Sequence, residues 1–265
     1  MREVTDLRAE ADELHAQLAT LPAADWDRAT LFKAWTINDV VQHLHAGDLL
    51  AAASARDPVE FKALAADMRA KRESGLTRVQ ETRQRLGDLT GPRLLARWRE
   101  TLASLCDALD ARDPKARLTW AGPDMGVRMF TTARQMEIWS HGQAIYDLLG
   151  RTRAPTDRLR NIAEIGVRTF GWTYVNRGLP VPPDPPRVRL TAPSGAVWEW
   201  LAESRSGMVE GEALEFCQVV TQTRNVADTR LVVTGAAAVD WMSIAQCFAG
   251  PPEEPPAPGS RRMAI

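Results

Sequence analysis

The sequence changes texture at a proline-rich stretch, residues 179–186 (LPVPPDPP), and this change constrains the fold more than any other feature. Before it, apolar residues recur over long segments at the three- and four-residue spacing of helices. After it, residues 187–191 and 196–200 alternate like two strands of a hairpin around a Pro-Ser-Gly turn. A chain of 265 residues also exceeds the usual size of one domain. The sequence therefore predicts the α+β class, with a helical N-terminal part and a small C-terminal α+β domain.

The N-terminal part is expected to be an antiparallel four-helix bundle. Thr36 and Asp39 have the spacing of a capping box that begins a helix, and Gly150 is a good C-terminal cap. A loop that contains Trp120, Gly122, Pro123 and Gly126 precedes the last of the four helices. The periodicity places the first, second and fourth helices over residues 7–18, 37–53 and 130–149. The third helix covers residues 59–86 and 91–109, either as one helix or in two pieces.

The C-terminal part is shorter and more varied. Besides the hairpin, the pattern predicts a strand over residues 229–235 and helices over 156–175, 212–222 and 239–248. Proline and small polar residues dominate the end of the chain. We therefore expect three segments, a metal-binding bundle over 1–155, a small α+β domain over 156–250, and a flexible tail over 251–265.

Charge and cysteine content exclude several classes of partner. Lys plus Arg number 33 and Asp plus Glu 34, so the net charge of −1 gives no general attraction to nucleic acid. The charged, periodic N-terminus does not resemble a secretory signal, and no apolar run reaches the roughly 18 residues of a membrane span. Three widely spaced cysteines indicate reduced thiols. We expect a cytoplasmic protein that binds neither nucleic acid nor a membrane.

Histidine is scarce, which makes its placement informative. Glu137 lies four residues before one of the histidines on the most strongly periodic helix, so both side chains project from one face and can chelate one ion. Pairs of this kind also occur as ordinary surface partners, which is the simpler alternative. The four histidines are His15, His43, His45 and His141.

A second helix supplies two candidate ligands that helical geometry alone does not separate. His43 and His45 flank the apolar stripe of that helix, one on each side. Asp48 falls on the stripe itself, where a carboxylate is costly to bury without a partner. It either orients a ligand, contacts a substrate, or lies in solvent near the end of the helix.

Two segments, 35–48 (WTINDVVQHLHAGD) and 134–142 (RQMEIWSHG), resemble the mycothiol-dependent maleylpyruvate isomerase family within the DinB-like superfamily of metal-binding bundles. The resemblance implies that His43, Glu137 and His141 are the metal ligands and makes His45 a neighbour of the site. It extends over about the first 150 residues, and the C-terminal part is similar to the α+β domain often appended in this family. The family commonly has an aspartate three residues after the last ligand; this chain has Ala144 there and Asp147 one turn later.

The resemblance implies a function as well as a site. Three protein ligands leave coordination positions open, as in catalytic metal sites. We expect a metal-dependent isomerase or S-transferase that uses mycothiol or a similar small thiol to act on a small electrophile or natural-product intermediate. Zinc is the expected metal, with nickel, iron or manganese as alternatives. No cysteine of the chain is needed as nucleophile, and Arg134 and Arg177 are interpreted as surface or ion-pair residues.

Three other functions fit the sequence. The metal can activate water or act as a Lewis acid in hydrolysis, dehydration or cyclisation without a thiol. The protein can bind metal without catalysis. The histidine pattern can also be coincidental, in which case the bundle is an interaction module. Bundles of this superfamily often pair through their helices, so a homodimer is a further expectation.

Overall fold

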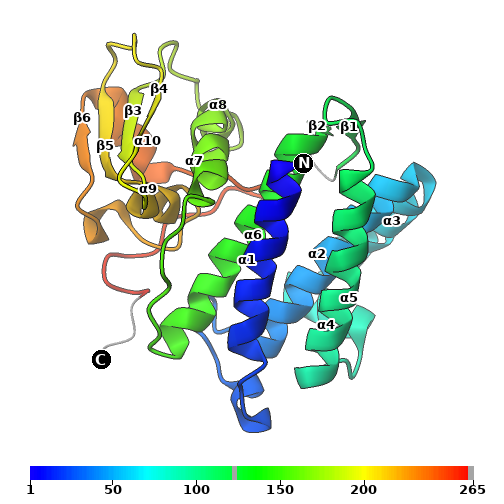
Figure 1. The fold of residues 1–265 in the computed structure, drawn as a ribbon. Helices are drawn as coiled ribbons and strands as arrows, with labels where there is room; N and C mark the ends of the chain where they lie inside the picture. The colour runs from blue at the N-terminus through cyan, green and yellow to red at the C-terminus, as the bar shows by residue number, and fades with distance from the viewer. Residues whose placement is uncertain (121–123, 262–265) are drawn as a thin grey trace. The chain divides into compact units, whose positions relative to one another are not determined.

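The computed structural model describes residues 1–120 and 124–261, and the chain divides into two compact units, Met1–Leu148 and Leu149–Ile265 (Figure 1). The first unit is helical apart from a short hairpin, and the second combines a four-stranded sheet with helices. The predicted α+β class is thus confirmed. The finer division into three segments stays a prediction.

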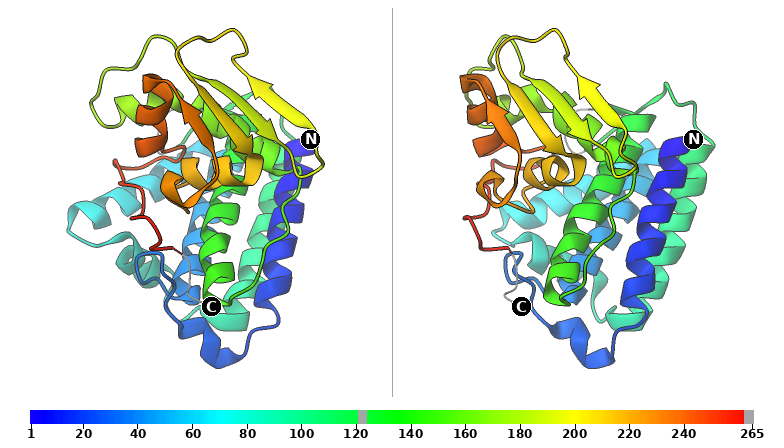
Figure 2. Two further views of the ribbon diagram at one scale, coloured as in Figure 1. Left: turned by 90° about the vertical axis from the view of Figure 1, so that its left-hand side faces the viewer. Right: turned by 60° about the vertical axis from the view of Figure 1, so that its left-hand side comes forward.

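Long helices form the core of the first unit. α2 packs against α5 and α6, and α1 packs against the same two helices, so that the four lie side by side (Figure 2). Their apolar faces supply fully buried residues such as Leu14, Leu44 and Leu105. The helices of this unit are α1 (Arg2–Leu18), η1 (Ala23–Asp27), α2 (Ile37–Arg56), α3 (Pro58–Glu73), α4 (Arg78–Leu86), α5 (Gly91–Asp110) and α6 (Val127–Leu148).

The directions of the four long helices follow from polar contacts between their ends. The N-terminus of α1 pairs with Asp110 at the end of α5, so these two helices are antiparallel. Asp48 of α2 contacts Arg134 of α6, whereas His43, earlier in α2, contacts Glu137, later in α6, so this pair is antiparallel too. α2 and α5 run parallel, because Gln42 bonds to Leu89 just before α5 and Asp48, later in α2, bonds to Trp98, later in α5. This neighbouring pair therefore differs from the expected antiparallel arrangement, because α3 and α4 return the chain to the end of the unit where α2 begins.

Most predicted boundaries in this unit agree with the structure to within about three residues. The helical pattern over 59–86 consists of α3 and α4, which separate near Gly75, a residue with φ of +93°. Part of the predicted loop forms a hairpin of β1 (Arg117–Leu118) and β2 (Met125–Gly126). Gly122 and Pro123, which were also assigned to that loop, lie outside the described residues.

The second unit is built on a mixed sheet with strand order β4-β3-β5-β6. The predicted hairpin is the antiparallel pair β3–β4, while β5 lies parallel to β3. Val188, Leu190 and Val209 are buried on one face, and Arg189 pairs with Glu210 on the other. Its elements are α7 (Leu159–Arg168), α8 (Phe170–Val175), β3 (Arg187–Thr191), β4 (Val197–Trp200), β5 (Met208–Glu212), α9 (Ala213–Val220), η2 (Val226–Asp228), β6 (Val232–Thr234) and α10 (Ala236–Ile244).

Two features of this unit differ from the expected pattern. The helix predicted over 156–175 is divided at Thr169 into α7 and α8, and β5 occupies residues to which the sequence pattern gave no strand. The described part of the C-terminal segment, 251–261, is hydrogen-bonded within the unit. Gln222 donates to the carbonyl of Glu253 over 2.9 Å, and Asn225 to that of Pro256 over 2.8 Å. Flexibility of the tail stays a prediction.

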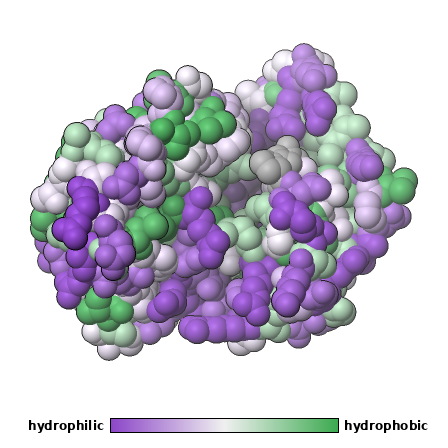
Figure 3. Space-filling model, turned by 90° about the horizontal axis from the view of Figure 1, so that it is seen from above, coloured by the Kyte–Doolittle hydropathy of each residue, from purple (hydrophilic) through white to green (hydrophobic). Residues whose placement is uncertain are grey.

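The surface is mixed in character. On the face seen in Figure 3, hydrophobic residues form small separate patches among hydrophilic ones. Within residues 1–120 and 124–261, no helix is both long enough and apolar enough to cross a membrane.

Candidate metal centre

His43 of α2 and Glu137 and His141 of α6 converge between the two helices. One carboxylate oxygen of Glu137 lies 3.3 Å from Nε2 of His43 and 3.3 Å from Nε2 of His141. The two imidazole centroids are 4.5 Å apart, and one donor atom from each residue lies within 4.8 Å of the others. The three side chains are 13%, 22% and 15% exposed for His43, Glu137 and His141, so the cluster is sheltered but open to small molecules.

The protonation states of this cluster suit a cation. Burial, with a smaller contribution from the neighbouring His141, lowers the pKa of His43 to about 3 despite the nearby carboxylate. Burial alone raises the pKa of Glu137, but the hydrogen bonds and charges of the two histidines hold it well below its usual value. At neutral pH, His43 is therefore neutral and Glu137 ionised, the forms in which these groups bind metal.

The distances can be compared with those of a shared ion. Charge-assisted N–H···O contacts are usually about 2.7–2.9 Å long, which is shorter than either contact here. In a tetrahedral zinc site with bonds of about 2.0–2.1 Å, ligand atoms are separated by about 3.3–3.4 Å. The two imidazole–carboxylate distances fit that spacing, and the donor set fits zinc, nickel, iron or manganese.

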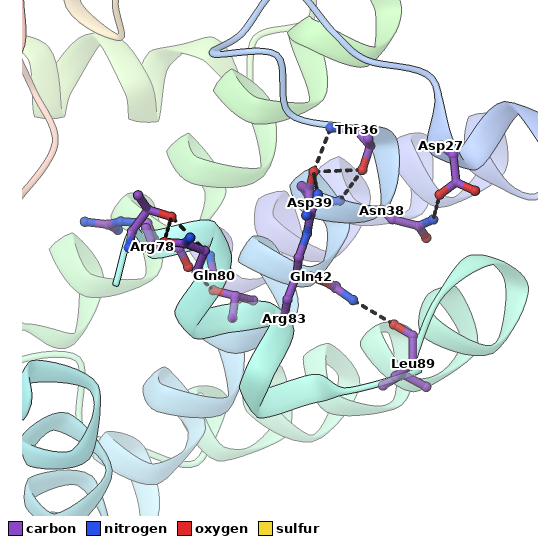
Figure 4. A network of polar contacts seen from close by, with 11 residues as sticks. Asp27, Thr36, Asn38, Asp39, Gln42, Arg78, Gln80, Arg83 and Leu89 are labelled. Carbon is purple, nitrogen blue, oxygen red and sulfur yellow. Dashed lines mark hydrogen bonds and ion pairs between the residues drawn. The ribbon is translucent and has the colours of Figure 1, made fainter. Parts of the chain in front are cut away.

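Polar contacts fix the beginning of α2, which carries the first of these residues (Figure 4). The side chain of Thr36 accepts from the backbone of Asp39, whose carboxylate accepts in turn from the backbone of Thr36, so the predicted capping box is present. Arg83 of α4 donates two hydrogen bonds to Asp39, at 2.7 and 2.8 Å. Gln42 donates to the carbonyl of Leu89 over 3.0 Å. These contacts attach the first turns of α2 to α4 and to the residues before α5, next to His43.

Comparison with protein families identifies the N-terminal unit. Residues 7–146 match the model of the "Mycothiol maleylpyruvate isomerase N-terminal domain", which is more than half of the chain. The chain belongs to this family. The matched range includes His43, Glu137 and His141, and the resemblance inferred from the two sequence motifs is confirmed.

Relatives within the family include uncharacterized proteins from two strains of Mycobacterium tuberculosis. Each is 38% identical over 249 residues, which cover 94% of this chain and 96% of the relative, so the similarity includes the second unit. Two crystal structures of a mycothiol-dependent maleylpyruvate isomerase, one of them a histidine-to-alanine mutant, also match. They are 15% and 14% identical with TM-scores of 0.49 and 0.50, and each comparison covers 82% of this chain and 87% of the other. The likeness to the mutant structure supports a shared fold.

The structure also shows where the other residues considered in the sequence analysis lie. His45 is 2% exposed, and its Nδ1 has no hydrogen-bond partner among the described residues, so it lies in the core and outside the cluster. Asp147 accepts a hydrogen bond from Gln143 over 2.9 Å. Arg177 donates to Gln246 and to two backbone carbonyls within the second unit.

Asp48 forms a closed cluster with Arg134 and Trp98, which we call the buried brace. Nε of Arg134 donates to one oxygen of Asp48 over 2.9 Å, and Nε1 of Trp98 donates to the other over 2.8 Å. Asp48 is fully buried and Arg134 is 5% exposed, so the arginine is an ion-pair residue and not a surface one. Gly47 leaves room for this arginine, because an added Cβ would lie 2.8 Å from Nη2. The brace joins α2, α5 and α6.

Two aromatic residues lie beside the cluster: Phe32, which the sequence did not single out, and Trp35, which it gave only as the first residue of the family motif. Phe32 and Trp35 lie in the segment before α2, and their rings contact His141. Residues 28–36, which precede α2, contain no Gly, Asn or Pro that would indicate a turn, so the sequence pattern gave no signal for a turn there.

Proposed function

We propose that this protein is a metal-dependent enzyme that uses an exogenous small thiol, mycothiol or a close analogue, to isomerise a small electrophile or to transfer the thiol to it. The observation that carries the proposal is the convergence of His43, Glu137 and His141 within a domain of the mycothiol maleylpyruvate isomerase family. Zinc is the metal we propose, and the cytoplasm, where such a thiol is available, is the proposed location.

The residues of the cluster would have distinct tasks. His43 and His141 would bind a divalent ion through neutral imidazole nitrogens, and Glu137 would contribute the negative charge. When bound, the ion favours the thiolate form of a coordinated thiol and so makes it a nucleophile. The low exposure of the three side chains keeps bulk water from much of the cluster, which strengthens its electrostatic interactions.

The cysteines of the chain support an external thiol. Cys106, Cys217 and Cys247 are all buried thiols. Burial raises the pKa of Cys106 to about 12 and that of Cys217 well above its usual value, so neither is ionised at neutral pH. Since the thiolate is the reactive form, the raised pKa values of Cys106 and Cys217 support a thiol supplied from solution.

The test is a turnover assay with zinc-loaded protein. Small electrophiles, maleylpyruvate among them, are incubated with and without mycothiol, and loss of substrate and formation of isomer or thiol adduct are followed by chromatography. We expect turnover only with thiol and metal together, and none with His141→Ala. Turnover that needs the metal but is unchanged by the thiol would contradict the proposal and favour a metal-activated water or Lewis-acid reaction. Stable zinc binding with no turnover would favour a non-catalytic metal protein.

A further inference from the structure

The segment before α2 contains a strained turn. Lys33 and Ala34 have φ of +51° and +55°, and the N–H of Trp35 donates to the carbonyl of Phe32 over 2.9 Å. Positive φ at both central residues together with this hydrogen bond defines a type I′ turn, which normally takes Asn-Gly or a similar pair. Side chains with a Cβ are disfavoured there, so the surrounding structure must hold the turn in place.

Contacts on both sides of the turn supply that constraint. The N–H of Thr30 donates to the carbonyl of Trp35 over 2.8 Å, and Ala29 pairs with Thr36 in an isolated antiparallel bridge. Thr36 is itself the cap of α2. The strained turn is thus tied directly to the helix that carries His43.

The turn brings two aromatic rings onto the candidate ligands. The rings of Phe32 and Trp35 meet edge to face with centroids 4.9 Å apart. Trp35 lies parallel to the imidazole of His141, with an interplanar angle of 3° and a centroid distance of 5.7 Å, and Phe32 meets the same imidazole edge-on at 5.1 Å. Trp35 also contacts the ring of His43 at 5.3 Å. Both imidazoles are therefore held by the same short segment.

Among the described residues, no protein hydrogen bond to Nδ1 of either ring contributes to this orientation. A histidine that binds a metal usually donates its other ring nitrogen to a carboxylate, a carbonyl or water, and this bond fixes the ring. Within residues 1–120 and 124–261, the hydrogen-bonding contacts of His43 and His141 join Nε2 of each ring to Glu137 and leave Nδ1 without a protein partner. Besides the contact of Nε2 with Glu137, the packing of the aromatic rings restricts rotation of His141 about its side-chain bonds.

We propose that Phe32 and Trp35 are positioning residues, an aromatic clamp that the strained turn holds against His141 and His43 in place of the usual hydrogen bonds. The expected effect of the clamp on metal affinity rests on the function proposed above, whereas its effect on the orientation of the imidazole rings does not. Aromatic contacts of this geometry are favourable, and the turn directs both rings to the same imidazole.

The experiment measures ring packing and metal affinity separately. NMR of the metal-free protein reports the ring-proton shifts of His141, which the stacked indole moves upfield, and competition with a chromophoric chelator reports zinc affinity. The variants are Trp35→Leu, which removes the aromatic face, and Trp35→Phe, which keeps one. Trp120→Leu is the matched control, because Trp120 is another half-buried tryptophan of the first unit, whose ring contacts are with Phe61 and Phe130.

We expect Trp35→Leu to move the His141 resonances downfield and to weaken zinc binding roughly tenfold or more, in the range seen when the groups that orient metal ligands are removed. Trp35→Phe should retain most of the affinity, and Trp120→Leu should change neither readout. Lys33→Asn with Ala34→Gly, which suits both positive φ values, should raise the melting temperature and leave the affinity unchanged.

Unchanged His141 shifts in Trp35→Leu, or zinc affinity equal to that of the parent, would overturn the clamp. If Trp35→Leu does not fold, Trp35→Phe decides the question, because the clamp requires an aromatic ring but not an indole. A loss of zinc affinity in folded Trp35→Phe as large as the loss in His141→Ala would also overturn the clamp. A parent protein that binds no zinc would overturn the proposed function, and the shifts in the metal-free protein would still decide whether the clamp exists.

Discussion

Helices α2 and α6 carry two polar clusters that differ in how completely their groups are paired. In the buried brace, both oxygens of Asp48 accept hydrogen bonds of normal length, and the ion pair with Arg134 is shielded from water. In the His43–Glu137–His141 cluster, the contacts are longer, the side chains are partly exposed, and three donor atoms point to one region. Both oxygens of Asp48 are satisfied by protein donors, whereas we propose that the second cluster takes an additional partner. We propose a structural role for the first cluster and a chemical role for the second.

The largest expected effect on stability is at the brace. Asp48→Leu leaves the guanidinium of Arg134 buried without a counter-charge, and we expect it to lower the free energy of unfolding by about 3–5 kcal/mol. Glu137→Gln, which changes the half-sheltered carboxylate of the other cluster, should stay within about 1 kcal/mol of the metal-free parent. Urea denaturation with a chelator present measures both. Equal stabilities of the two variants would remove the distinction between the clusters.

A double variant tests whether the charge of Arg134 is the cause. Asp48→Leu with Arg134→Met replaces the ion pair by apolar side chains, which is often neutral when both charges are removed together. We expect the double variant to recover at least half of the stability lost in Asp48→Leu, measured as a double-mutant cycle with the same urea series. Additive losses would show that the two residues do not act as a pair.

The stability of the His43–Glu137–His141 cluster should instead respond to metal. Zinc at about 100 times its dissociation constant should stabilise the parent by about 2.7 kcal/mol, since it binds the folded state. The melting temperature with and without zinc measures this effect. His141→Ala should show no such shift, and Asp48→Asn, which changes the brace, should retain it. A shift of the same size in His141→Ala would place the bound zinc elsewhere.

The smallest effect is expected at Asp39, a third carboxylate on α2. Burial raises the pKa of Asp39, but hydrogen bonds from Arg83 and Thr36 lower it by more. Because the pKa is lower in the folded state, the carboxylate contributes stability that is fully present above about pH 4 and is lost as the pH falls through the folded-state pKa. Asp39→Asn should cost about 1 kcal/mol at neutral pH, because it weakens the capping box with Thr36 and the ion pair with Arg83.

Urea midpoints between pH 2 and pH 7 provide the check for Asp39. The parent should lose stability more steeply than Asp39→Asn below about pH 4. Parallel pH profiles of the two proteins would show that Asp39 does not titrate with folding. Arg83→Gln is the matched variant, because it removes the charged partner and leaves the contact with Thr36.

Local signals predicted much of the fold. The capping box at Thr36 and Asp39 placed the start of α2 correctly, and the alternating residues on both sides of a Pro-Ser-Gly turn identified the β3–β4 hairpin. β5 was missed, because it pairs in parallel with β3 and β4 lies between the two in the sequence, so no hairpin turn marks the pairing. The break between α3 and α4 is similarly weak in the sequence, since the helical pattern continues on both sides of Gly75.

The candidate site was only partly accessible to sequence reasoning. Helical spacing paired Glu137 with His141, but the choice of His43 over His45 came from the family resemblance, because both flank the same stripe. The partners of Asp48 are Trp98 and Arg134, which are distant in sequence and become neighbours only through packing of three helices. The turn before α2, and with it the contact of Phe32 and Trp35 with the histidines, was missed because Lys33 and Ala34 do not resemble a type I′ pair.

Metal content tests the central claim most directly. Elemental analysis is carried out on protein purified without chelator or a metal-binding tag, beside His43→Ala, Glu137→Gln and His141→Ala, with His45→Ala as the matched control from the same helix. We predict close to one equivalent of metal in the parent and in His45→Ala, and its loss in both ligand-histidine variants, with a strong reduction in Glu137→Gln. A parent without metal that takes up no added zinc, nickel, iron or manganese, or full metal content in His43→Ala and His141→Ala, would contradict the account.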